Sequence, residues 1–331
     1  MAVAVAGVGF AIVAFQGQAA RLPAVSLTQA NGPIALANGD PARITLVNPD
    51  GTEAAQITTG REPDPRAEER GYFEESAPQW SPDGTQIAFV RWYDPGNSLC
   101  VIGIDGTGFH VLVPEFAGSQ LAWSPDGSTF AYYNFEDETI HLVDADGSHD
   151  RVLTGLPTVP RNQPPAWLPT WSPDSSRIAF ASKDVWTIRS DGTDLTRLTN
   201  LPESEFAFEP SWSPDGSKIL FSNGGWETSG GGGAQSGGTL YLVGADGSNL
   251  TSITEDARFW WGADWSPDGR FVVSMRATPK GSDDPYEWTD SGVYVMAADG
   301  SDIRPLAQKL WGMPAWGPAP NPFASSSPPT S

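Results

Sequence analysis

Cysteine, histidine and basic residues are scarce in this sequence. Its one cysteine, Cys100, excludes an intramolecular disulfide, and three histidines leave little material for a zinc site. The chain has 19 Lys and Arg residues against 40 Asp and Glu, which gives a formal net charge of -21. Such a chain repels nucleic-acid phosphates and anionic lipid surfaces. We therefore expect no nucleic-acid partner, no metal and no cofactor.

Long apolar runs are missing except at the N-terminus. Residues 2–15, AVAVAGVGFAIVAF, form an uncharged run of signal-peptide length, and Gly17 and Ala19 supply a small-x-small pattern that allows cleavage after Ala19. A basic segment before the run is absent, and a buried N-terminal strand is the alternative. No cysteine follows the run, so a lipoprotein anchor has no support. Residues 1–30 are predicted to be a signal peptide or membrane anchor plus linker, which places the protein outside the cytoplasm, in the periplasm or secreted.

One motif is abundant. PQWSPDGTQIAFV at residues 78–90 recurs as LAWSPDGSTFAYY, PTWSPDSSRIAFA, PSWSPDGSKILFS and ADWSPDGRFVVSM, and in clipped form as PAWGP. The motif tryptophans follow one another at intervals of 41 to 53 residues, and they are Trp80, Trp123, Trp171, Trp212, Trp265 and Trp316. A self-similar period in this range indicates a repeat architecture, in which we expect these six residues to be structural.

Each repeat has the pattern of a four-stranded antiparallel sheet. The tryptophan ends a first strand, Ser-Pro-Asp-Gly makes a tight turn, and apolar residues at alternate positions mark a second strand. A third strand leads into an Asp-Gly hairpin. Seven residues beyond each hairpin aspartate stands an aliphatic residue that predicts a fourth strand, namely Ile57, Leu112, Leu153, Leu198, Ile253 or Leu306.

Stacking of such sheets around an axis gives an all-β, six-bladed β-propeller over residues 31–318. Residues 31–60 contain the second, third and fourth strands of a repeat without a tryptophan motif, whereas residues 314–316 supply an isolated first strand. We expect the C-terminal strand to pair with the N-terminal three strands and so close the ring. Residues 319–331 form a Pro/Ser-rich tail that is predicted to be disordered.

These motifs resemble the WD40-like repeat called PD40, which is found in the propeller of TolB and in prolyl-oligopeptidase-type peptidases. The resemblance covers residues 31–318 and implies a TolB-like propeller that binds a protein partner. The α/β domain that precedes the TolB propeller has no counterpart between Ala19 and Asn31, and the G-x-S-x-G elbow of the peptidases is absent. Oligogalacturonate lyases share this propeller and use a histidine cluster, but the three histidines here fall in unrelated repeat positions. His141 and Cys100 occupy the same third-strand packing position.

Two further segments suggest ligand loops but fit turns better. DADGSHD at residues 144–150 places its glycine at the wrong position for an EF-hand loop, and the other repeats carry an Asp-Gly turn in the same place. The glycine-rich segment at residues 224–238 lacks the Gly-Lys-Ser/Thr ending of a phosphate loop. We interpret them as a hairpin and as a flexible insertion.

Loop lengths indicate where binding occurs. The Ser-Pro-Asp-Gly and Asp-Gly turns lie on one side of a propeller, and the variable connections lie on the other side, where aromatic and charged residues gather. The candidate binding residues are Phe73, Glu75, Arg161, Trp167, Glu205, Phe206, Arg258, Trp260 and Trp311.

The leading hypothesis is an exported, monomeric, non-enzymatic propeller that binds a protein, a peptide or an envelope component such as a glycan, without catalytic residues. Membrane contact is expected only through the N-terminal run. One alternative is a carbohydrate-active or other hydrolase or lyase that uses Glu75, Glu205 or Asp264 at the channel mouth. A second is a stalk or sensor domain tethered by residues 2–15.

Overall fold

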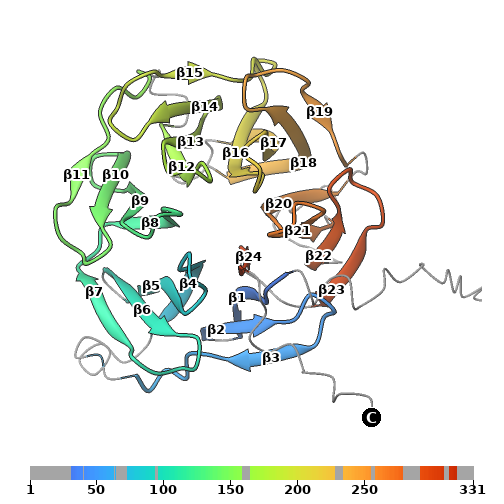
Figure 1. The fold of residues 1–331 in the computed structure, drawn as a ribbon. Helices are drawn as coiled ribbons and strands as arrows, with labels where there is room; N and C mark the ends of the chain where they lie inside the picture. Colours follow the sequence, from blue (N-terminus) through green and yellow to red (C-terminus); the bar gives the residue numbers. More distant parts are fainter. Residues whose placement is uncertain are drawn as a thin grey trace, which may run out of the picture.

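The computed structural model describes residues 31–39, 41–62, 64, 73–93, 96–158, 165–227, 234–254, 258–278, 291–308 and 313–318. This part of the chain forms six four-stranded antiparallel sheets arranged around a central axis (Figure 1). The predicted all-β, six-bladed propeller is confirmed. The predicted leader at residues 1–30 and the tail at 319–331 lie outside the described residues. Within the described ranges every element is a strand, so none of them is a helix able to cross a membrane.

The six blades follow the chain in order. Blade 1 comprises β24 (Ala315–Trp316), β1 (Ile34–Gly39), β2 (Ala42–Val47) and β3 (Glu53–Gln56). Blade 2 comprises β4 (Glu74–Trp80), β5 (Gln86–Trp92), β6 (Asn97–Gly103) and β7 (His110–Pro114). Blade 3 comprises β8 (Gly118–Trp123), β9 (Thr129–Asn134), β10 (Thr139–Asp144) and β11 (Arg151–Val152).

The other three blades repeat this arrangement. Blade 4 comprises β12 (Trp167–Trp171), β13 (Arg177–Ser182), β14 (Asp184–Arg189) and β15 (Thr196–Arg197). Blade 5 comprises β16 (Phe206–Trp212), β17 (Lys218–Glu227), β18 (Ala234–Gly244) and β19 (Thr251–Ser252). Blade 6 comprises β20 (Phe259–Trp265), β21 (Phe271–Ala277), β22 (Gly292–Ala297) and β23 (Arg304–Gln308).

Burial explains why the repeat pattern specifies these strands. The second strand of each blade lies inside its sheet and is covered on both faces by neighbouring blades, so it is almost entirely apolar. The residues seven positions past the motif tryptophans are fully buried, and they are Ile87, Phe130, Ile178, Ile219 and Val272. Fourth strands are short, but four of the six predicted aliphatic residues, Ile57, Leu153, Leu198 and Ile253, still bond to the third strand, whereas Leu112 and Leu306 lie at shifts of register. The Leu198 N–H, for example, donates to the Val185 carbonyl at 2.9 Å.

The ring closes through blade 1, as the sequence predicts. β24 pairs with β1, with Ile34 opposite Trp316 and Ala35 opposite Ala315. The backbone N–H of Trp316 also donates to the carboxylate of Asp264 in blade 6 at 2.8 Å. The two ends of the described chain therefore hold one sheet together and join it to the preceding blade.

The repeat tryptophans connect neighbouring blades. Three of them donate their indole N–H to a carbonyl of the preceding inner strand at 3.2 Å, in the pairs Trp80 to Ala315, Trp171 to Ala122 and Trp265 to Ser211. Trp316 donates to the Gly32 carbonyl at 3.0 Å. Trp123 instead donates to Gly127 in its own turn. Five of the six motif tryptophans therefore have hydrogen bonds within the fold, and the sixth, Trp212, packs against the apolar core of blades 4 and 5.

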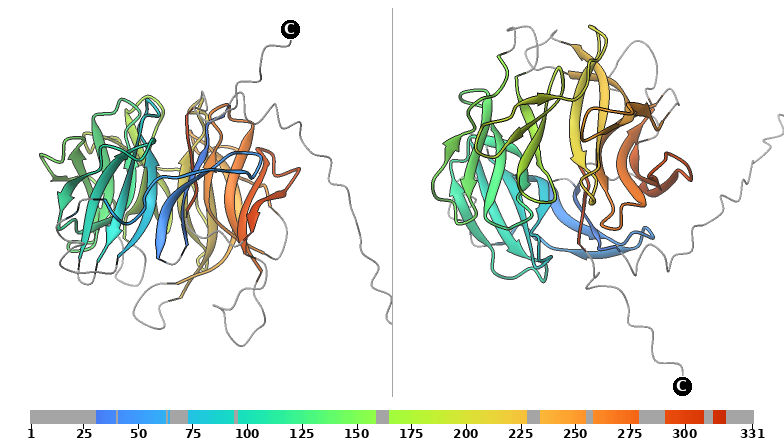
Figure 2. Two further views of the ribbon diagram at one scale, coloured as in Figure 1. Left: turned by 90° about the horizontal axis from the view of Figure 1, so that it is seen from below. Right: turned by 45° about the horizontal axis from the view of Figure 1, so that its top comes forward.

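The two sides of the ring differ. We call the side that carries the Ser-Pro-Asp-Gly and Asp-Gly turns the hairpin face, and the opposite side the loop face. The ends of the described chain lie on the hairpin face, because the Asp268 N–H in the blade 6 turn donates to the Asn31 side chain at 3.2 Å and Pro318 lies against Gly84 in the blade 2 turn. In Figure 2 (left), β17 and β18 extend from the ring on the loop face, opposite the hairpin turns. The variable connections therefore lie on the loop face, opposite the stereotyped turns and the ends of the described chain.

His141 packs on strand β10, as expected from its repeat position. Its ring lies 5.5 Å from the Tyr132 ring between centroids, and its nitrogens lie 3.0 Å from Asp150 and 2.9 Å from Asp137. Burial lowers the pKa of His141, but the two carboxylates outweigh it, and the pKa is raised. The pair of ion contacts is therefore strongest while the imidazole is protonated.

A His141→Gln variant tests this arrangement. Because the folded-state pKa is raised, His141 contributes stability below its unfolded pKa of about 6.5, and this contribution is lost as the pH rises through the folded pKa. We expect the variant to lose about 0.2 to 1 kcal/mol at acidic pH and almost nothing at alkaline pH. Urea unfolding across this range measures the difference, with His149→Gln on the exposed turn as the control. A penalty that stays constant with pH would contradict the assignment.

Candidate binding face and axial pocket

An aromatic cluster is exposed on the loop face between blades 2 and 3. Phe135 follows β9 and is 47% exposed. Its ring lies 6.1 Å from the Trp92 ring and 5.6 Å from the Tyr133 ring, and the latter contact is edge-on. Trp92 is held by a hydrogen bond from its indole N–H to the Ser76 hydroxyl at 2.6 Å. A rigid, exposed aromatic group of this kind is typical of the anchor residues of protein interfaces.

Three of the predicted binding residues are buried instead. Phe73 and Glu75 lie inside the seam between blades 1 and 2, and Trp260 is completely buried against Tyr294 in blade 6, with ring centroids 6.0 Å apart. A residue that contacts a partner must be accessible, so these three side chains act within the fold. Periodicity alone did not show that their side chains point inward.

The other candidates divide into two groups. Trp167, Glu205 and Phe206 are half-buried near the loop face, where Phe206 lies 5.0 Å from Lys183 Nζ and Glu205 accepts from Asn223 at 2.5 Å. Arg258 is exposed just before β20. Arg161 and Trp311 lie outside the described residues. The structure therefore leaves four predicted residues in positions that a partner can reach.

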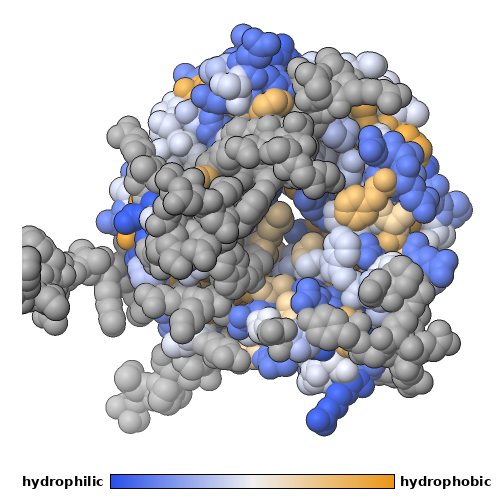
Figure 3. Space-filling model, turned by 180° about the vertical axis from the view of Figure 1, so that it is seen from behind, coloured by the Kyte–Doolittle hydropathy of each residue, from blue (hydrophilic) through white to orange (hydrophobic). Residues whose placement is uncertain are grey.

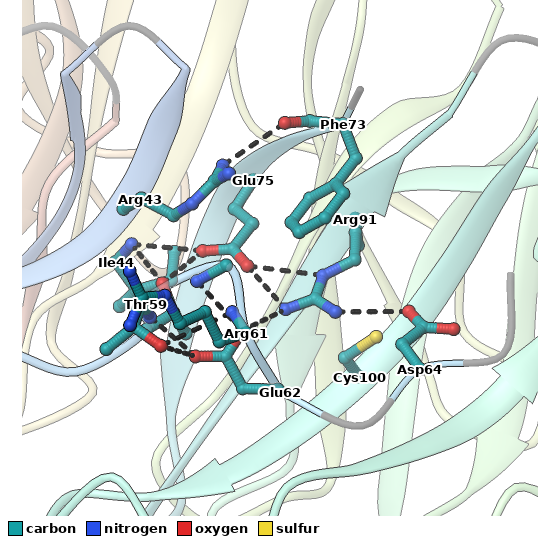
Figure 4. A network of polar contacts seen from close by, with 12 residues as sticks. Arg43, Ile44, Thr59, Arg61, Glu62, Asp64, Phe73, Glu75, Arg91 and Cys100 are labelled. Carbon is teal, nitrogen blue, oxygen red and sulfur yellow. Dashed lines mark hydrogen bonds and ion pairs between the residues drawn. The ribbon is translucent and has the colours of Figure 1, made fainter. Parts of the chain in front are cut away.

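Arg91 organises the buried seam that contains Phe73 and Glu75 (Figure 4). Its guanidinium donates to Glu75 at 2.7 Å, to Glu62 at 2.9 Å and to Asp64 at 3.1 Å. The Phe73 ring lies 4.3 Å from the Arg91 guanidinium and 4.4 Å from that of Arg43. Arg91 thus compensates three carboxylates that come from β4 and from the connection between the two blades.

The remaining contacts of this network extend into blade 1. Glu75 Oε2 accepts from the Ile44 N–H at 3.2 Å and from the Thr58 hydroxyl. Burial raises the pKa of Glu75 despite the opposing charge of Arg91, whereas hydrogen bonds and Arg91 outweigh burial at Glu62 and lower its pKa. Burial also raises the pKa of the nearby Cys100 thiol, which keeps it protonated. The network therefore connects blade 2 to blade 1, with Arg91, Asp64 and Glu75 buried inside the seam.

The inner strands surround an axial pocket. In five blades the residue three positions before the motif tryptophan has a positive φ, between 50° and 58°, and these residues are Ala77, Gln120, Leu168, Glu209 and Gly262. At each of them the pairing with the second strand shifts by a β-bulge. The bulges line a cavity of about 120 Å³ on the axis. In Figure 3, which shows the loop face, the molecule is hollowed at its centre.

Two acids face this pocket. Glu209 on β16 accepts from the backbone N–H of Gly262, and Asp264 on β20 accepts from the Ser211 hydroxyl at 3.0 Å and from the Trp265 N–H at 2.9 Å. Removal from water raises the pKa of Glu209 to about 7 and also raises the pKa of Asp264. Of the three acids that the enzyme hypothesis named, Asp264 lines the axial pocket, whereas Glu75 lies in the Arg91 seam and Glu205 does not line the pocket.

Glu209, Trp92 and Phe135 are the residues that sequence reasoning missed. The position three before each tryptophan holds Ala, Gln, Leu, Glu, Gly and Met in the six repeats. Such a mixture of small, apolar and acidic residues is unusual in a strand otherwise filled by packing residues, and an alignment of the repeats on their tryptophans would have singled it out. Phe135 stands in a short turn whose other residues are acidic, and that contrast is its signal.

Among the described residues, no group of three or more His, Cys, Asp or Glu side chains is arranged to hold a metal ion. The comparison with known families decides the classification. Residues 122–318, more than half of the chain, match the PD40 family, described as the TolB beta propeller domain. The chain belongs to this family. The matched residues run from the end of β8 to the closing strand β24, so they include most of the blades of this PD40 propeller.

Individual relatives agree with this classification. The uncharacterized protein Atu1656 of Agrobacterium fabrum is 28% identical over 269 residues, which cover 75% of this chain and 83% of that protein. The structure of TolB from Acinetobacter baumannii has a TM-score of 0.63 at 19% identity and covers 87% of this chain and 67% of its own. A structure from Agrobacterium tumefaciens assigned to TolB has a TM-score of 0.57 at 22% identity, covering 83% and 88%. These two structures support the propeller fold of this PD40 chain.

Proposed function

We propose that this PD40 propeller is an exported, non-enzymatic protein that binds a protein or peptide partner through its loop face. The observation that carries the proposal is the difference between the two sides of the ring. The stereotyped turns and both ends of the described chain lie on the hairpin face, whereas the connections of variable length lie on the loop face. Membership of the TolB β-propeller family favours a protein partner by analogy.

The proposed contact surface consists of exposed and half-buried loop-face residues. Phe135 and Trp92 supply the aromatic anchor, and Glu205, Phe206, Trp167 and Arg258 from blades 4 to 6 supply further contacts. Arg161 and Trp311 belong to the same proposal on the basis of the sequence. A monomer that presents one such face suits a single protein partner, with an envelope glycan as the other candidate ligand.

Matched variants on the two faces test the proposal. The chain from residue 20 onward serves as bait for proteins of the cell envelope, and a glycan array is probed in parallel. We expect one protein to be captured, without a glycan signal. The affinity of Phe135→Ser for that protein should fall about tenfold or more, since an interface anchor contributes about 2 kcal/mol.

Leu250→Ser is the control for this experiment. Leu250 is 44% exposed on the hairpin side, close to the 47% of Phe135, so the two changes remove similar exposed apolar surface. The control should bind normally. Equal loss in both variants, or unchanged binding of Phe135→Ser, would refute the assignment of the loop face.

One observation favours a second function, in which the axial pocket hydrolyses or cleaves a carbohydrate. A carboxyl group with a pKa of about 7 is suited to donate a proton at neutral pH, and Glu209 lies near Asp264 on the pocket wall. Release of reducing sugar from an envelope polysaccharide, abolished by Glu209→Gln, would favour this function over the binding role.

A further inference from the structure

Glu209, which is half-buried, lacks the cationic partner that the buried acids of the Arg91 seam have. Among the described residues that line the axial pocket, Glu209 and Asp264 are the only charged side chains, and both are acidic. Both oxygens of Asp264 accept hydrogen bonds that connect blades 5, 6 and 1. Glu209 accepts one bond, from the Gly262 N–H to Oε2, and its Oε1 has no hydrogen-bond partner among the described residues. In the Arg91 seam, by contrast, each buried carboxylate faces a guanidinium.

The fold does not require an acid at this position. The equivalent residues of other blades are Ala77, Gln120, Leu168 and Gly262, and they form the same bulge. The positive φ is common to these positions. The glutamate adds a carboxyl group with one hydrogen bond and with no cation among the described residues that line the pocket, and partial removal from water raises its pKa. A costly residue of this kind at a site where neutral residues suffice marks a binding position.

The volume and the lining of the pocket suit the end of a long basic side chain. Its volume of about 120 Å³ holds roughly four waters at about 30 Å³ each, enough for the end of one side chain but not for a folded segment. Leu121, Leu168 and Met313 provide apolar wall for a methylene stem. Gln120 lies on the same wall, and its Oε1 has no hydrogen-bond partner in the described part of the chain.

We propose that the axial pocket receives the ammonium or guanidinium end of a lysine or arginine side chain of the partner, with Glu209 Oε1 as the direct acceptor and the Asp264 carboxylate as a second negative charge. This inference rests on the proposed function. The charge of the molecule agrees with it, since the chain carries a net charge of -21 and the exposed Phe135 is followed directly by Glu136, Asp137 and Glu138. An acidic face steers a basic partner and disfavours an acidic one.

Small probes test the pocket without the partner. The full propeller is titrated with n-butylammonium chloride and with 1-butanol, and the amide NMR resonance of Gly262 reports on Glu209. We expect the ammonium, but not the alcohol, to shift this resonance. In Glu209→Gln the ammonium affinity should fall about tenfold or more, which corresponds to about 1.4 kcal/mol. Glu203→Gln, which neutralises an exposed acid outside the pocket, should leave the affinity unchanged.

The pH dependence of the ammonium affinity tests the role of Glu209 directly, because a purely structural role of this residue would not change that dependence. Glu209 is partly protonated near pH 7, so the ammonium should bind more tightly as the pH rises from about 6 to about 8, with release of a proton. Among the described residues that line the pocket, Asp264 is the one other titratable group. Glu209→Gln should abolish this dependence while keeping the side-chain shape and the native fold.

Three outcomes would overturn the inference. They are ammonium binding that is the same in Glu209→Gln, equal binding of 1-butanol, and a response to calcium chloride without one to the ammonium, which would indicate a divalent cation site. The affinity of the partner for two variants distinguishes a failure of this inference from a failure of the proposed function. If the partner binds Glu209→Gln normally but loses affinity for Phe135→Ser, the pocket inference fails and the binding face stands. If Phe135→Ser binds normally, the proposed face itself fails.

Discussion

Arg91→Met is expected to lower the free energy of unfolding by about 3 to 5 kcal/mol. The substitution keeps an apolar stem of similar length but removes the guanidinium that compensates Glu62, Asp64 and Glu75. Those carboxylates remain in a buried seam, and an uncompensated buried charge is far more costly than the loss of an exposed ion pair. Urea unfolding followed by tryptophan fluorescence measures the change.

Two controls separate charge from packing in this experiment. Arg177→Met removes an exposed pairing with Asp194 and should cost less than about 1 kcal/mol. Adding Glu75→Gln to Arg91→Met should recover part of the loss, because one uncompensated carboxylate becomes neutral. The penalty of Arg91→Met should also shrink as the pH falls, since protonation neutralises the same groups. A loss below about 1 kcal/mol would show that the seam does not depend on the ion pairs.

Removal of the closing strand is expected to have the other large effect. Trp316→Ala deletes a buried indole that packs between blades 6 and 1 and donates to the Gly32 carbonyl, so we expect a loss of about 3 to 5 kcal/mol. A chain ending at Met313 loses β24 altogether. The inner edge of β1 is then unpaired, and the Asp264 carboxylate loses the Trp316 N–H. We expect this chain to unfold at much lower urea and to associate through the open edge.

A chain ending at Pro318 is the matched control for this truncation. It retains β24 and every contact described for Trp316, so its urea midpoint and its elution on size exclusion should equal those of the full chain. If the chain ending at Met313 also behaves like the full chain, the ring does not depend on the pairing of its two ends.

The repeat columns show how far sequence reasoning reaches in this molecule. Turn chemistry at Ser-Pro-Asp-Gly and alternation of apolar residues are properties of neighbours along the chain, and both recur at fixed spacing. They predicted the strands, the six sheets and the pairing of β24 with β1. One copy of the motif would not have sufficed for this prediction. Six copies at regular spacing indicate one repeated unit, because each copy packs in the same way.

The candidate site was predicted less well, and the reason is visible at Glu75 and Trp260. Both lie at the start of a first strand, just after a connection between blades, where composition indicates aromatic and charged residues but not the direction of each side chain. Arg91 is sixteen residues from Glu75 in sequence, and Asp64 reaches it from the connection between blades. Such ion pairs depend on which segments the tertiary fold brings together, and the local sequence pattern does not encode this.

By itself, therefore, the sequence determined the number of blades, their strands and the manner in which the ring closes, since each follows from spacing and turn residues repeated along the chain. Only the tertiary structure decided which acids are compensated and which are not. The inner-strand bulges turn Glu209 toward the axis, while the seam between blades 1 and 2 encloses Glu75 around Arg91. Burial and the choice of partner are properties of the assembled ring, because they depend on residues that only closure brings together.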